Sequence, residues 1–296
     1  MEILLAQLVS GISLAAVLLL VALGLTFTYG QMNVVNMAHG ELIMAGAYTT
    51  YTLERVLGGG REGLAFLLAL PAAFAVAGLL GLAMERGLLR RLYDRPLDTL
   101  LATWGLSLIL QQVARDLFGA SNVQVTKPLW LDGAVTLGGV VLPWSRLAIA
   151  GLAAACVAGM GLFLARTGAG RRMRAVMQNR PLAAVSGVST GRTDGLTFLV
   201  GAGLAGLAGV AVTVLGPIGP ALGTFYIVDA FLVVIVGGLG RLSGAVLAAL
   251  AIGLINAFVE YSTQASLAKA IVFMGVVVFL QVRPQGLFTF RSRGLA

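Results

Sequence analysis

Runs of apolar residues separated by short polar segments make up most of the chain. They cover residues 8–29, 36–53, 64–84, 97–118, 147–164, 196–215, 225–237, 245–258 and 267–282. An α-helix needs about 20 apolar residues to cross a hydrocarbon core about 30 Å thick. The pattern predicts an all-α, polytopic integral membrane protein with eight or nine hydrophobic segments, forming a single transmembrane domain over residues 1–296.

Two of the runs are short for full crossings. Residues 225–237 and 245–258 flank a glycine-rich turn. Non-helical backbone is tolerated at membrane depth only where protein or a water-filled cavity satisfies its polar groups. We therefore expect a broken or re-entrant element between residues 225 and 258.

The composition excludes a soluble domain. Hydrophobic residues make up 58% of the chain and charged residues only 11%, whereas soluble domains carry about 25% charged residues. The formal net charge of +8 does not indicate a nucleic-acid partner, because the basic residues lie between apolar runs, where they set orientation and contact lipid. Cys156 is the only cysteine, which excludes an intrachain disulfide and a cysteine metal cluster.

The basic residues predict the orientation of the spans. Loops rich in Lys and Arg stay in the cytoplasm, and 13 of the 20 basic residues fall in three inter-span or terminal segments. By parity, the loop at about 119–145, with Trp130 and Trp144 as interfacial anchors, is extracytoplasmic. Nine crossings place the amino terminus outside, whereas re-entrance of one of the first three segments places it in the cytoplasm. The marker residues are Arg86, Arg90, Arg91 and Arg95, then Arg166, Arg171, Arg172, Arg174, Arg180 and Arg192, then Arg283, Arg291 and Arg293.

A dense polar cluster lies at residues 33–41, between the first two apolar runs. Asn33, Asn36 and Gly40 follow helical spacing, and His39 comes three residues after Asn36, so one helical face could present two amides and an imidazole while Glu41 points elsewhere. Polar side chains within a span are functional candidates because their burial in lipid is costly. The alternative is a solvated structural turn. His39 is the only histidine, so a two-histidine metal site is impossible.

A polar stripe follows the span around Trp104. Its members recur every four residues, a spacing that keeps them near one face of an α-helix. The stripe either lines a path for a small polar solute or buries against a neighbouring helix while its hydroxyls bond their own carbonyls. The members are Thr99, Thr103, Ser107, Gln111 and Arg115. Asp229 is a further isolated polar residue, either on the path or at a helix cap.

The loop at about 166–194 contains a basic amphipathic segment. From Arg171 to Ala184 it reads R-R-M-R-A-V-M-Q-N-R-P-L-A-A, which predicts one short helix with Pro181 near its end. Such a helix either rests on anionic lipid or docks a cytoplasmic partner. The candidate docking residues are Arg171, Arg172, Arg174, Met177, Asn179 and Arg180.

Motifs for nucleotide binding are absent from the sequence. A phosphate loop needs G-x-x-x-x-G-K-[S/T], but the two lysines are Lys127, followed by Pro128, and Lys269, followed by Ala270. We expect a protein that is not an enzyme and that holds neither a cofactor nor a metal.

Several segments resemble one family of membrane proteins. They are G-L-T-F-T-Y-G-Q-M-N-V-V-N-M-A-H-G-E-L-I-M-A-G-A-Y at residues 24–48, L-L-A-T-W-G-L-S-L-I-L-Q-Q at 100–112, M-R-A-V-M-Q-N-R at 173–180, V-G-G-L-G-R-L-S-G-A at 236–245 and R-P-Q-G-L-F at 283–288. Together they resemble the branched-chain amino acid and urea permease family of ATP-binding cassette (ABC) importers, over nearly the whole chain. N-M-A-H-G-E and A-T-W-G-L-S look more like the first urea permease subunit than the leucine-type permease, although Arg241 departs from the urea pattern.

The resemblance implies a bacterial inner-membrane importer built from several subunits. The implied partners are a second homologous permease, two cytoplasmic ATP-binding subunits and an extracytoplasmic solute-binding protein, with the basic helix as the element that couples to the ATPases. Urea is the expected solute, and branched-chain amino acids or short amides are the alternative. A stand-alone urea or amide channel is a hypothesis of another class. The candidate path residues are Asn33, Asn36, His39, Glu41, Thr103, Ser107, Gln111 and Asp229.

Overall fold

The computed structural model shows a predominantly helical protein and describes residues 2–32, 34–93, 95–137 and 140–288. The long helices are α1 (Glu2–Met32), α2 (His39–Leu57), α3 (Glu62–Gly87), α4 (Pro96–Phe118), α5 (Trp144–Arg166), α8 (Thr190–Thr213), α9 (Leu222–Gly237), α10 (Leu242–Ser262) and α11 (Ala265–Val282). Each apolar run lies wholly or mostly in one of them, which confirms the all-α membrane class. Among the described residues, five helices are long and apolar enough to span a bilayer by themselves.

Helices α1 and α8 form the centre of the bundle. Helix α8 packs against α1, α2 and α3, and α1 also packs against α9 and α10. The contacts depend on small residues: a Cβ atom at Gly206 would lie 2.3 Å from the Ala73 carbonyl oxygen, and one at Gly209 would lie 2.1 Å from that of Ile43. Close approach of backbones is how helices associate in lipid, where the hydrophobic effect between them is lost.

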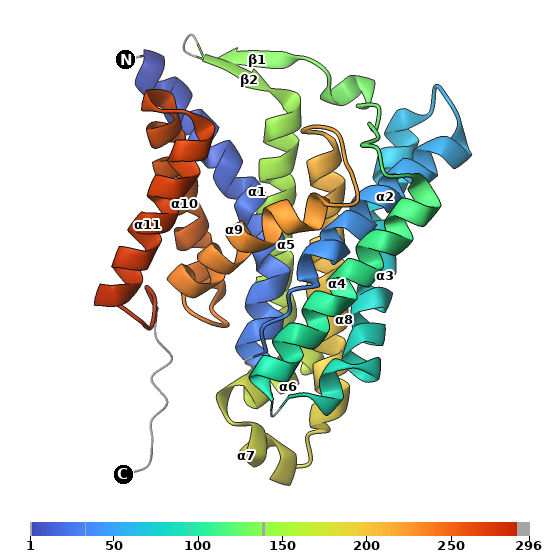
Figure 1. The fold of residues 1–296 in the computed structure, drawn as a ribbon, viewed down its shortest axis with the longest axis vertical. Coiled ribbons are helices and arrows are strands. Elements are labelled where there is room, and N and C mark those ends of the chain that lie inside the picture. Colours follow the sequence, from blue (N-terminus) through green and yellow to red (C-terminus); the bar gives the residue numbers. More distant parts are fainter. Residues whose placement is uncertain (1, 33, 94, 138–139, 289–296) are drawn as a thin grey trace.

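Two shorter helices, α2 and α9, begin near the middle of the molecule (Figure 1). Each follows a segment that is not regular helix, at residues 34–38 and 214–221. Their first turns touch, because a Cβ atom at Gly40 would lie 2.4 Å from the carbonyl oxygen of Gly223. The break expected near residue 238 is present, but α10 on its far side is a full helix of 21 residues. The break before α2 agrees with the alternative of a structural turn at residues 33–41, but Asn36, Ala38 and His39 are buried there, so the turn is not solvated.

The chain contains two halves with the same order of elements. In each half a long helix, α1 or α8, is followed by a non-helical segment, a helix that starts inside the bundle, and a four-residue turn. The turns read G-G-G-R at residues 58–61 and G-L-G-R at 238–241, with a positive-φ glycine at the first and third positions of both. Helix α1 runs away from the end that carries the amino terminus, and α8 runs back toward it (Figure 1). The halves therefore have opposite orientations, as in inverted repeats.

The two ends of the bundle differ. One end carries the antiparallel hairpin of β1 (Ala134–Leu137) and β2 (Val140–Pro143), which lies in the expected extracytoplasmic loop but was not predicted. The other end carries the short helices α6 (Gly168–Gln178) and α7 (Arg180–Val185) (Figure 1). Arg90 donates to the Gly191 carbonyl at 2.8 Å, so two of the basic segments meet at this end. Arg291 and Arg293 lie outside the described residues.

The glycine contacts give a stability prediction. Gly46→Ala should lower the midpoint of thermal unfolding in detergent by at least about 3 °C, the effect of overpacking, because its Cβ atom would lie 2.2 Å from the Gly206 carbonyl oxygen. Gly151→Ala is the control, since a Cβ atom there meets nothing within 4 Å. Equal midpoints for the two variants, measured by size-exclusion after heating, would contradict the packing described here.

Candidate functional site

A buried carboxylate joins three helices near the start of α2. Glu41 is only 2% exposed, and its Oε1 accepts hydrogen bonds from Ser107 Oγ at 2.8 Å and Gln111 Nε2 at 2.9 Å. The same Gln111 nitrogen lies 3.1 Å from Thr224 Oγ1 in the first turn of α9. Glu41 points in a different direction from His39, as the sequence indicated: its carboxylate faces α4, whereas the His39 ring lies beside Gly24 of α1.

Glu41 lies beside the amino termini of two helices, α2 and α9. It lies in the first turn of α2, and a Cβ atom at Gly223 would lie 2.8 Å from the Glu41 backbone nitrogen. Helix amino termini carry partial positive charge and favour anions. The carboxylate therefore sits where the positive ends of α2 and α9 converge.

The polar stripe on α4 forms a buried seam. Thr103 Oγ1 accepts the Met37 backbone N–H at 3.1 Å, and Thr99 donates to the Leu92 carbonyl at 2.7 Å. Thr99, Thr103, Ser107 and Gln111 are all buried, whereas Arg115 is exposed. Of the two interpretations from sequence, burial against a neighbour describes the Thr99 end of the stripe, while Ser107 and Gln111 bind the carboxylate.

Several buried polar atoms beside this seam have no hydrogen-bond partner among the described residues. They are Nδ2 of Asn36, both ring nitrogens of His39, Oε2 of Glu41 and the Tyr48 hydroxyl. His39 is fully buried and lies against the backbone of Val21. Asn36 precedes the helix, and its Oδ1 accepts the Ala38 N–H at 3.1 Å. The predicted helical face shared by Asn36, His39 and Gly40 is therefore wrong, and Asn33 lies outside the described residues.

Unsatisfied groups of this kind are uncommon in native structures. Asn36 and His39 both supply nitrogen donors, and the free Glu41 oxygen supplies an acceptor. A polar solute or water that entered here would find partners already in place. The cluster thus stays a candidate for the path.

Asp229 lies beside a large cavity. It is inside α9, so the alternative of a helix cap is wrong, and its Oδ2 lies 3.4 Å from Lys269 Nζ on α11. Both residues line a cavity of about 820 Å³ between α1, α9, α10 and α11, which Thr224 also lines. Lys269 was not among the residues predicted for the path, although it is the only charged residue in the apolar run at 267–282.

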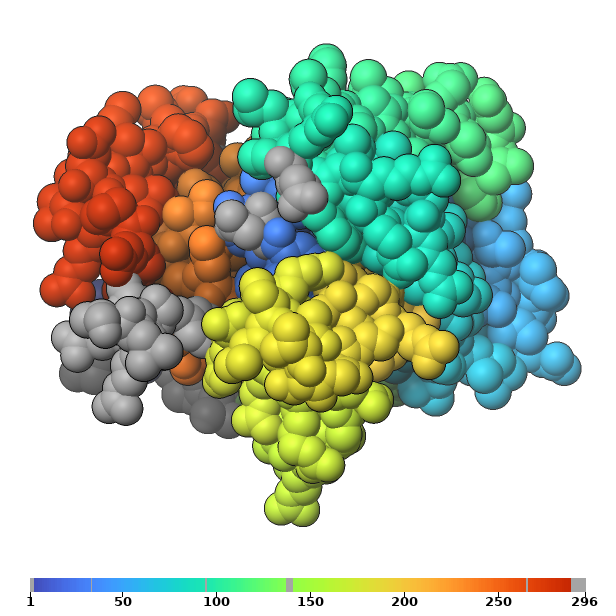
Figure 2. Space-filling model, turned by 90° about the horizontal axis from the view of Figure 1, so that it is seen from below, coloured from blue at the N-terminus to red at the C-terminus, as the bar shows by residue number. Residues whose placement is uncertain are grey.

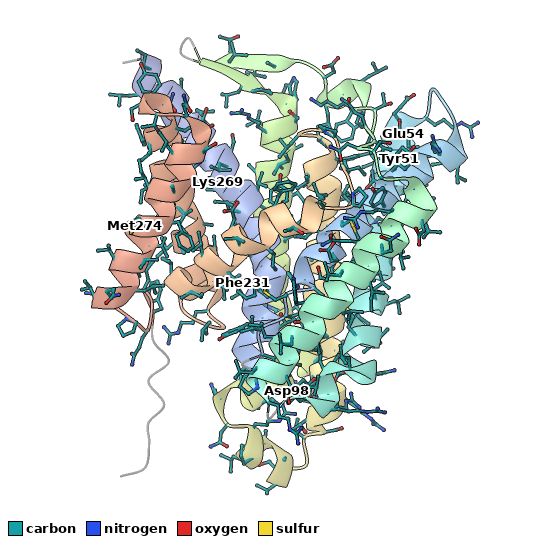
Figure 3. The ribbon with its side chains drawn as sticks, viewed as in Figure 1. Tyr51, Glu54, Asp98, Phe231, Lys269 and Met274 are labelled. Carbon is teal, nitrogen blue, oxygen red and sulfur yellow. The ribbon has the colours of Figure 1, made fainter. Side chains whose placement is uncertain are left out.

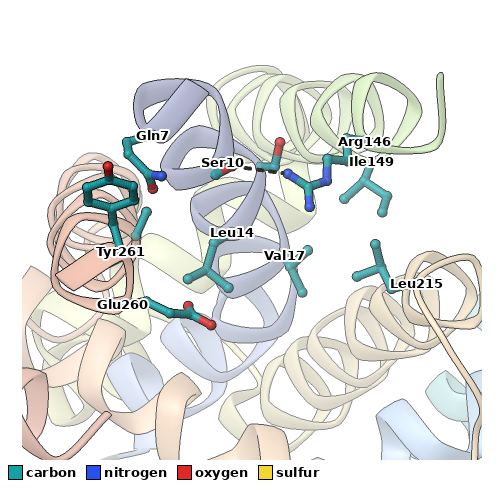
Figure 4. A pocket seen from close by; sticks show the side chains of 11 residues that line it. Gln7, Ser10, Leu14, Val17, Arg146, Ile149, Leu215, Glu260 and Tyr261 are labelled. Atoms are coloured by element: carbon teal, nitrogen blue, oxygen red, sulfur yellow. Dashed lines mark hydrogen bonds between the residues drawn. The ribbon is translucent and has the colours of Figure 1, made fainter. Parts of the chain in front are cut away.

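A second, smaller cavity lies among the outer ends of α1, α5 and α10 (Figure 4). Its volume is about 380 Å³, and Arg146 Nη1 donates to Ser10 Oγ there at 3.4 Å. Leu14 lines both this cavity and the larger one. The two cavities are therefore neighbours.

The basic loop forms two helices instead of the single helix predicted. Asn179 separates them and caps α7, because its Oδ1 accepts the Leu182 N–H at 2.9 Å. Helix α6 buries Met173 and Val176, and Met177 reaches the region of Gly30 on α1. The arginines of α6, Arg171, Arg172 and Arg174, are exposed. Figure 2 shows this segment standing in the middle of the face that it occupies.

Arg180 is held by the bundle. Its guanidinium makes two hydrogen bonds to the carboxylate of Asp194, which is fully buried and also accepts from Gln31 Nε2 at 2.8 Å. It also lies over the Tyr93 ring at 5.5 Å. This side chain therefore ties α7 to α1 and α8, and its predicted role in docking a cytoplasmic partner stays a prediction.

The buried carboxylate of Glu85 adds further hydrogen bonds at the end of the bundle that carries α6 and α7. Glu85 accepts from Arg90 at 2.9 and 3.0 Å and from the Tyr93 hydroxyl at 2.9 Å. Burial, followed by the hydrogen bond to Glu85, raises the pKa of Tyr93, so its hydroxyl stays protonated and keeps donating. The connection between α3 and α4 is thus fixed to the base of α8.

Taken with the apolar helices, inverted halves and polar seam, these features define a multi-pass membrane transport protein. The chain belongs to the family described as "Branched-chain amino acid transport system / permease component", whose model matches residues 7–281. It is a permease component located in the bacterial inner membrane.

Relatives of known description match along nearly their whole length. The chain is 29% identical over 291 residues to the high-affinity branched-chain amino acid transport system permease protein BraD of Pseudomonas aeruginosa, covering 95% of this chain and 94% of the relative. It is 26% identical to LivH of Escherichia coli K12, with the same coverage. It is 28% identical to a probable LivH of Methanocaldococcus jannaschii, covering 89% and 83%. No solved structure matches significantly.

The polar seam predicts a transport defect. Gln111→Leu removes the amide that joins Glu41 and Thr224, so solute uptake by the assembled transporter should fall about tenfold, the effect expected for a lost bond to a charged group. Gln112→Leu is the matched control, because Gln112 is exposed and bonds only Asp116 and Arg115 among the described residues. Normal solute uptake by Gln111→Leu at normal membrane abundance would show that Gln111 serves only in helix packing.

Proposed function

We propose that this chain is the permease subunit of an ABC importer that moves branched-chain amino acids. The observation that carries the proposal is the family match over residues 7–281, together with relatives whose names specify branched-chain amino acid transport. The urea preference expected from sequence finds no support in these relatives, and its alternative agrees with them better.

The large cavity favours the same solute class. Its walls include Leu18, Leu232, Ile252 and Phe273, and its charged groups are Asp229 and Lys269. An aliphatic amino acid needs apolar surface for its side chain and opposite charges for its ammonium and carboxylate groups. Urea has neither an aliphatic side chain nor charges.

Energy for import comes from other subunits in this proposal. The sequence has no phosphate loop, so ATP-binding subunits dock on the cytoplasmic end, a second homologous permease lies alongside, and an extracytoplasmic binding protein delivers the solute. The docking element consists of α6 and α7. It offers the exposed arginines of α6 and two exposed apolar side chains on α7, Leu182 and Val185.

The ion pair between half-exposed Arg180 and buried Asp194 transmits the movement of this element. Arg180 connects α7 to Asp194 of α8 and, through Asp194, to Gln31 of α1. Helices α1 and α8 are the central helices of the bundle. A displacement of α7 by the ATPases would therefore reach the core directly, and nucleotide turnover would shift the population of inward- and outward-facing states.

Uptake competition tests the solute. The assembled complex in proteoliposomes, containing this chain, its partner permease, the ATP-binding subunits and the binding protein, should accumulate labelled leucine when ATP is supplied inside. Unlabelled isoleucine and valine should compete, and urea should not. Competition by urea without competition by isoleucine would overturn the proposed solute.

The docking element gives a separate prediction. Arg174→Glu reverses an exposed charge on α6, so co-purification of the ATP-binding subunits should fall severalfold while the thermal midpoint of the permease changes little. Arg61→Glu is the control, because Arg61 is also exposed and lies between α2 and α3, where neighbouring Gly63 approaches Trp130 of the loop at 119–145. Unchanged ATPase association and uptake in Arg174→Glu would remove the docking assignment.

A further inference from the structure

The pair formed by Asp229 and Lys269 is placed where charges are costly. Asp229 is the only charged residue of α9 and Lys269 the only one of α11. Ionisable residues within membrane-spanning helices are rare, and they mark substrate or ion pathways by default. Figure 3 shows Lys269 nearer the hairpin end of α11 than Met274.

The pair is incompletely satisfied by its own contact. Its closest approach is 3.4 Å, and the Lys269 side chain is 64% exposed while that of Asp229 is 23% exposed. Charged hydrogen bonds of good geometry are shorter, at about 2.7 to 2.9 Å. Both groups therefore have capacity for further partners on the cavity side.

The cavity around the pair combines apolar walls with few polar groups. Its volume of about 820 Å³ lies within the range of about 300 to 1,000 Å³ for small-molecule sites. The polar groups besides the ion pair come from Thr224, Tyr226 and Asn256. A mostly apolar concavity with a small number of convergent polar groups is the usual form of a ligand site.

We propose that this cavity is a binding site for the free zwitterionic amino acid during import, with Asp229 receiving the α-ammonium group and Lys269 the α-carboxylate. The aliphatic side chain of the solute packs on Leu18, Leu232 and Ile252. The inference rests on the proposed function and adds to it the location of the site and the two recognition residues.

Charge complementarity supports this occupant. The solute carries a positive ammonium group and a negative carboxylate group, both attached to its α-carbon. The cavity presents one charged group of each sign. Insertion of the zwitterion replaces one long contact by two charge-assisted hydrogen bonds. The net charge of the site stays unchanged, which avoids the cost of an uncompensated charge within the membrane.

The surroundings place the site between the outer surface and the polar seam. On one side, Thr224 lines the cavity and bonds Gln111, which binds Glu41. On the other, Asn256 lines the cavity and bonds Glu260 at 3.4 Å, and Glu260 lines the outer cavity of Figure 4. A solute released at the hairpin end thus meets polar groups in sequence before it reaches the ion pair.

Single neutral substitutions test the two recognition residues. Asp229→Asn and Lys269→Gln should each lower leucine uptake by the assembled complex by about tenfold or more, the effect of losing a charged hydrogen bond. Lys127→Gln is the control, since Lys127 is the other lysine of the chain and is exposed in the outer loop. Leucine uptake that is unchanged by both substitutions would overturn the proposed binding site. The proposed function would still stand in that case, because the wild-type complex takes up leucine.

Paired substitutions separate recognition from a structural link between α9 and α11. The double variant Asp229→Asn with Lys269→Gln leaves no lone charge, so a structural role predicts recovery relative to the single variants, and so does the charge exchange Asp229→Lys with Lys269→Asp. Recognition predicts that neither double variant recovers, because the solute loses its partners or meets them reversed. Recovery to wild-type uptake in the charge exchange would overturn the proposal.

Chemical restoration of the ammonium group gives a further readout. Cys156 is the only native cysteine and is buried, so Lys269→Cys in a Cys156→Ala background offers one reactive thiol. Aminoethyl methanethiosulfonate restores a positive charge there and should recover a large part of leucine uptake, whereas uncharged methyl methanethiosulfonate should not. Equal recovery with both reagents would contradict a role for the charge. A wild-type complex that does not accumulate leucine would instead reject the proposed function.

Discussion

The contact between the first turns of α2 and α9 is the constraint on which the rest of the structure depends. Both helices start inside the bundle after non-helical backbone, and they meet because Gly40 and Gly223 have no side chains to keep their backbones apart. Such backbone persists at membrane depth only where protein covers it. The central helices α1 and α8 supply that cover through their own small residues, and the inverted arrangement of the two halves places one short helix from each half at the same point.

The positions of the buried charged residues follow from this helix arrangement. Two helix amino termini converge where Glu41 lies, and its hydrogen bonds to Ser107 and Gln111 connect α4 to the junction. At the end that carries α6 and α7, buried carboxylates of Asp194 and Glu85 hold Arg180 and Arg90, so two of the basic segments are fixed to the core of the bundle. The cavity beside α9 lies between these regions and the outer surface. A movement imposed at α7 therefore has a continuous set of contacts through which to alter the junction.

Sequence patterns predicted the apolar helices and the polar face of α4, because each signal is local. The apolar run at residues 36–53 placed the start of α2 three residues too early, since Met37 and Ala38 are as apolar as a helix would be. The sequence did contain a signal that α6 and α7 are separate helices. Asn179 is a helix-capping residue, and Pro181 lies in the first turn of α7, where proline is favoured. Contacts between distant residues, such as that of Asp229 with Lys269, could not be predicted, because the sequence shows only one charged residue in each of the runs 225–237 and 267–282. Solute preference depended on a few residues in a motif, and relatives over the whole chain favour branched-chain amino acids.

The central claim is that this permease moves solute only when other subunits drive it. The most direct test compares leucine flux in liposomes that contain the isolated chain with flux in liposomes that contain the complete complex. The account predicts no flux above protein-free liposomes for the isolated chain, and accumulation by the complex that requires internal ATP and the binding protein. Robust flux of leucine, urea or another amide through the isolated chain would contradict it.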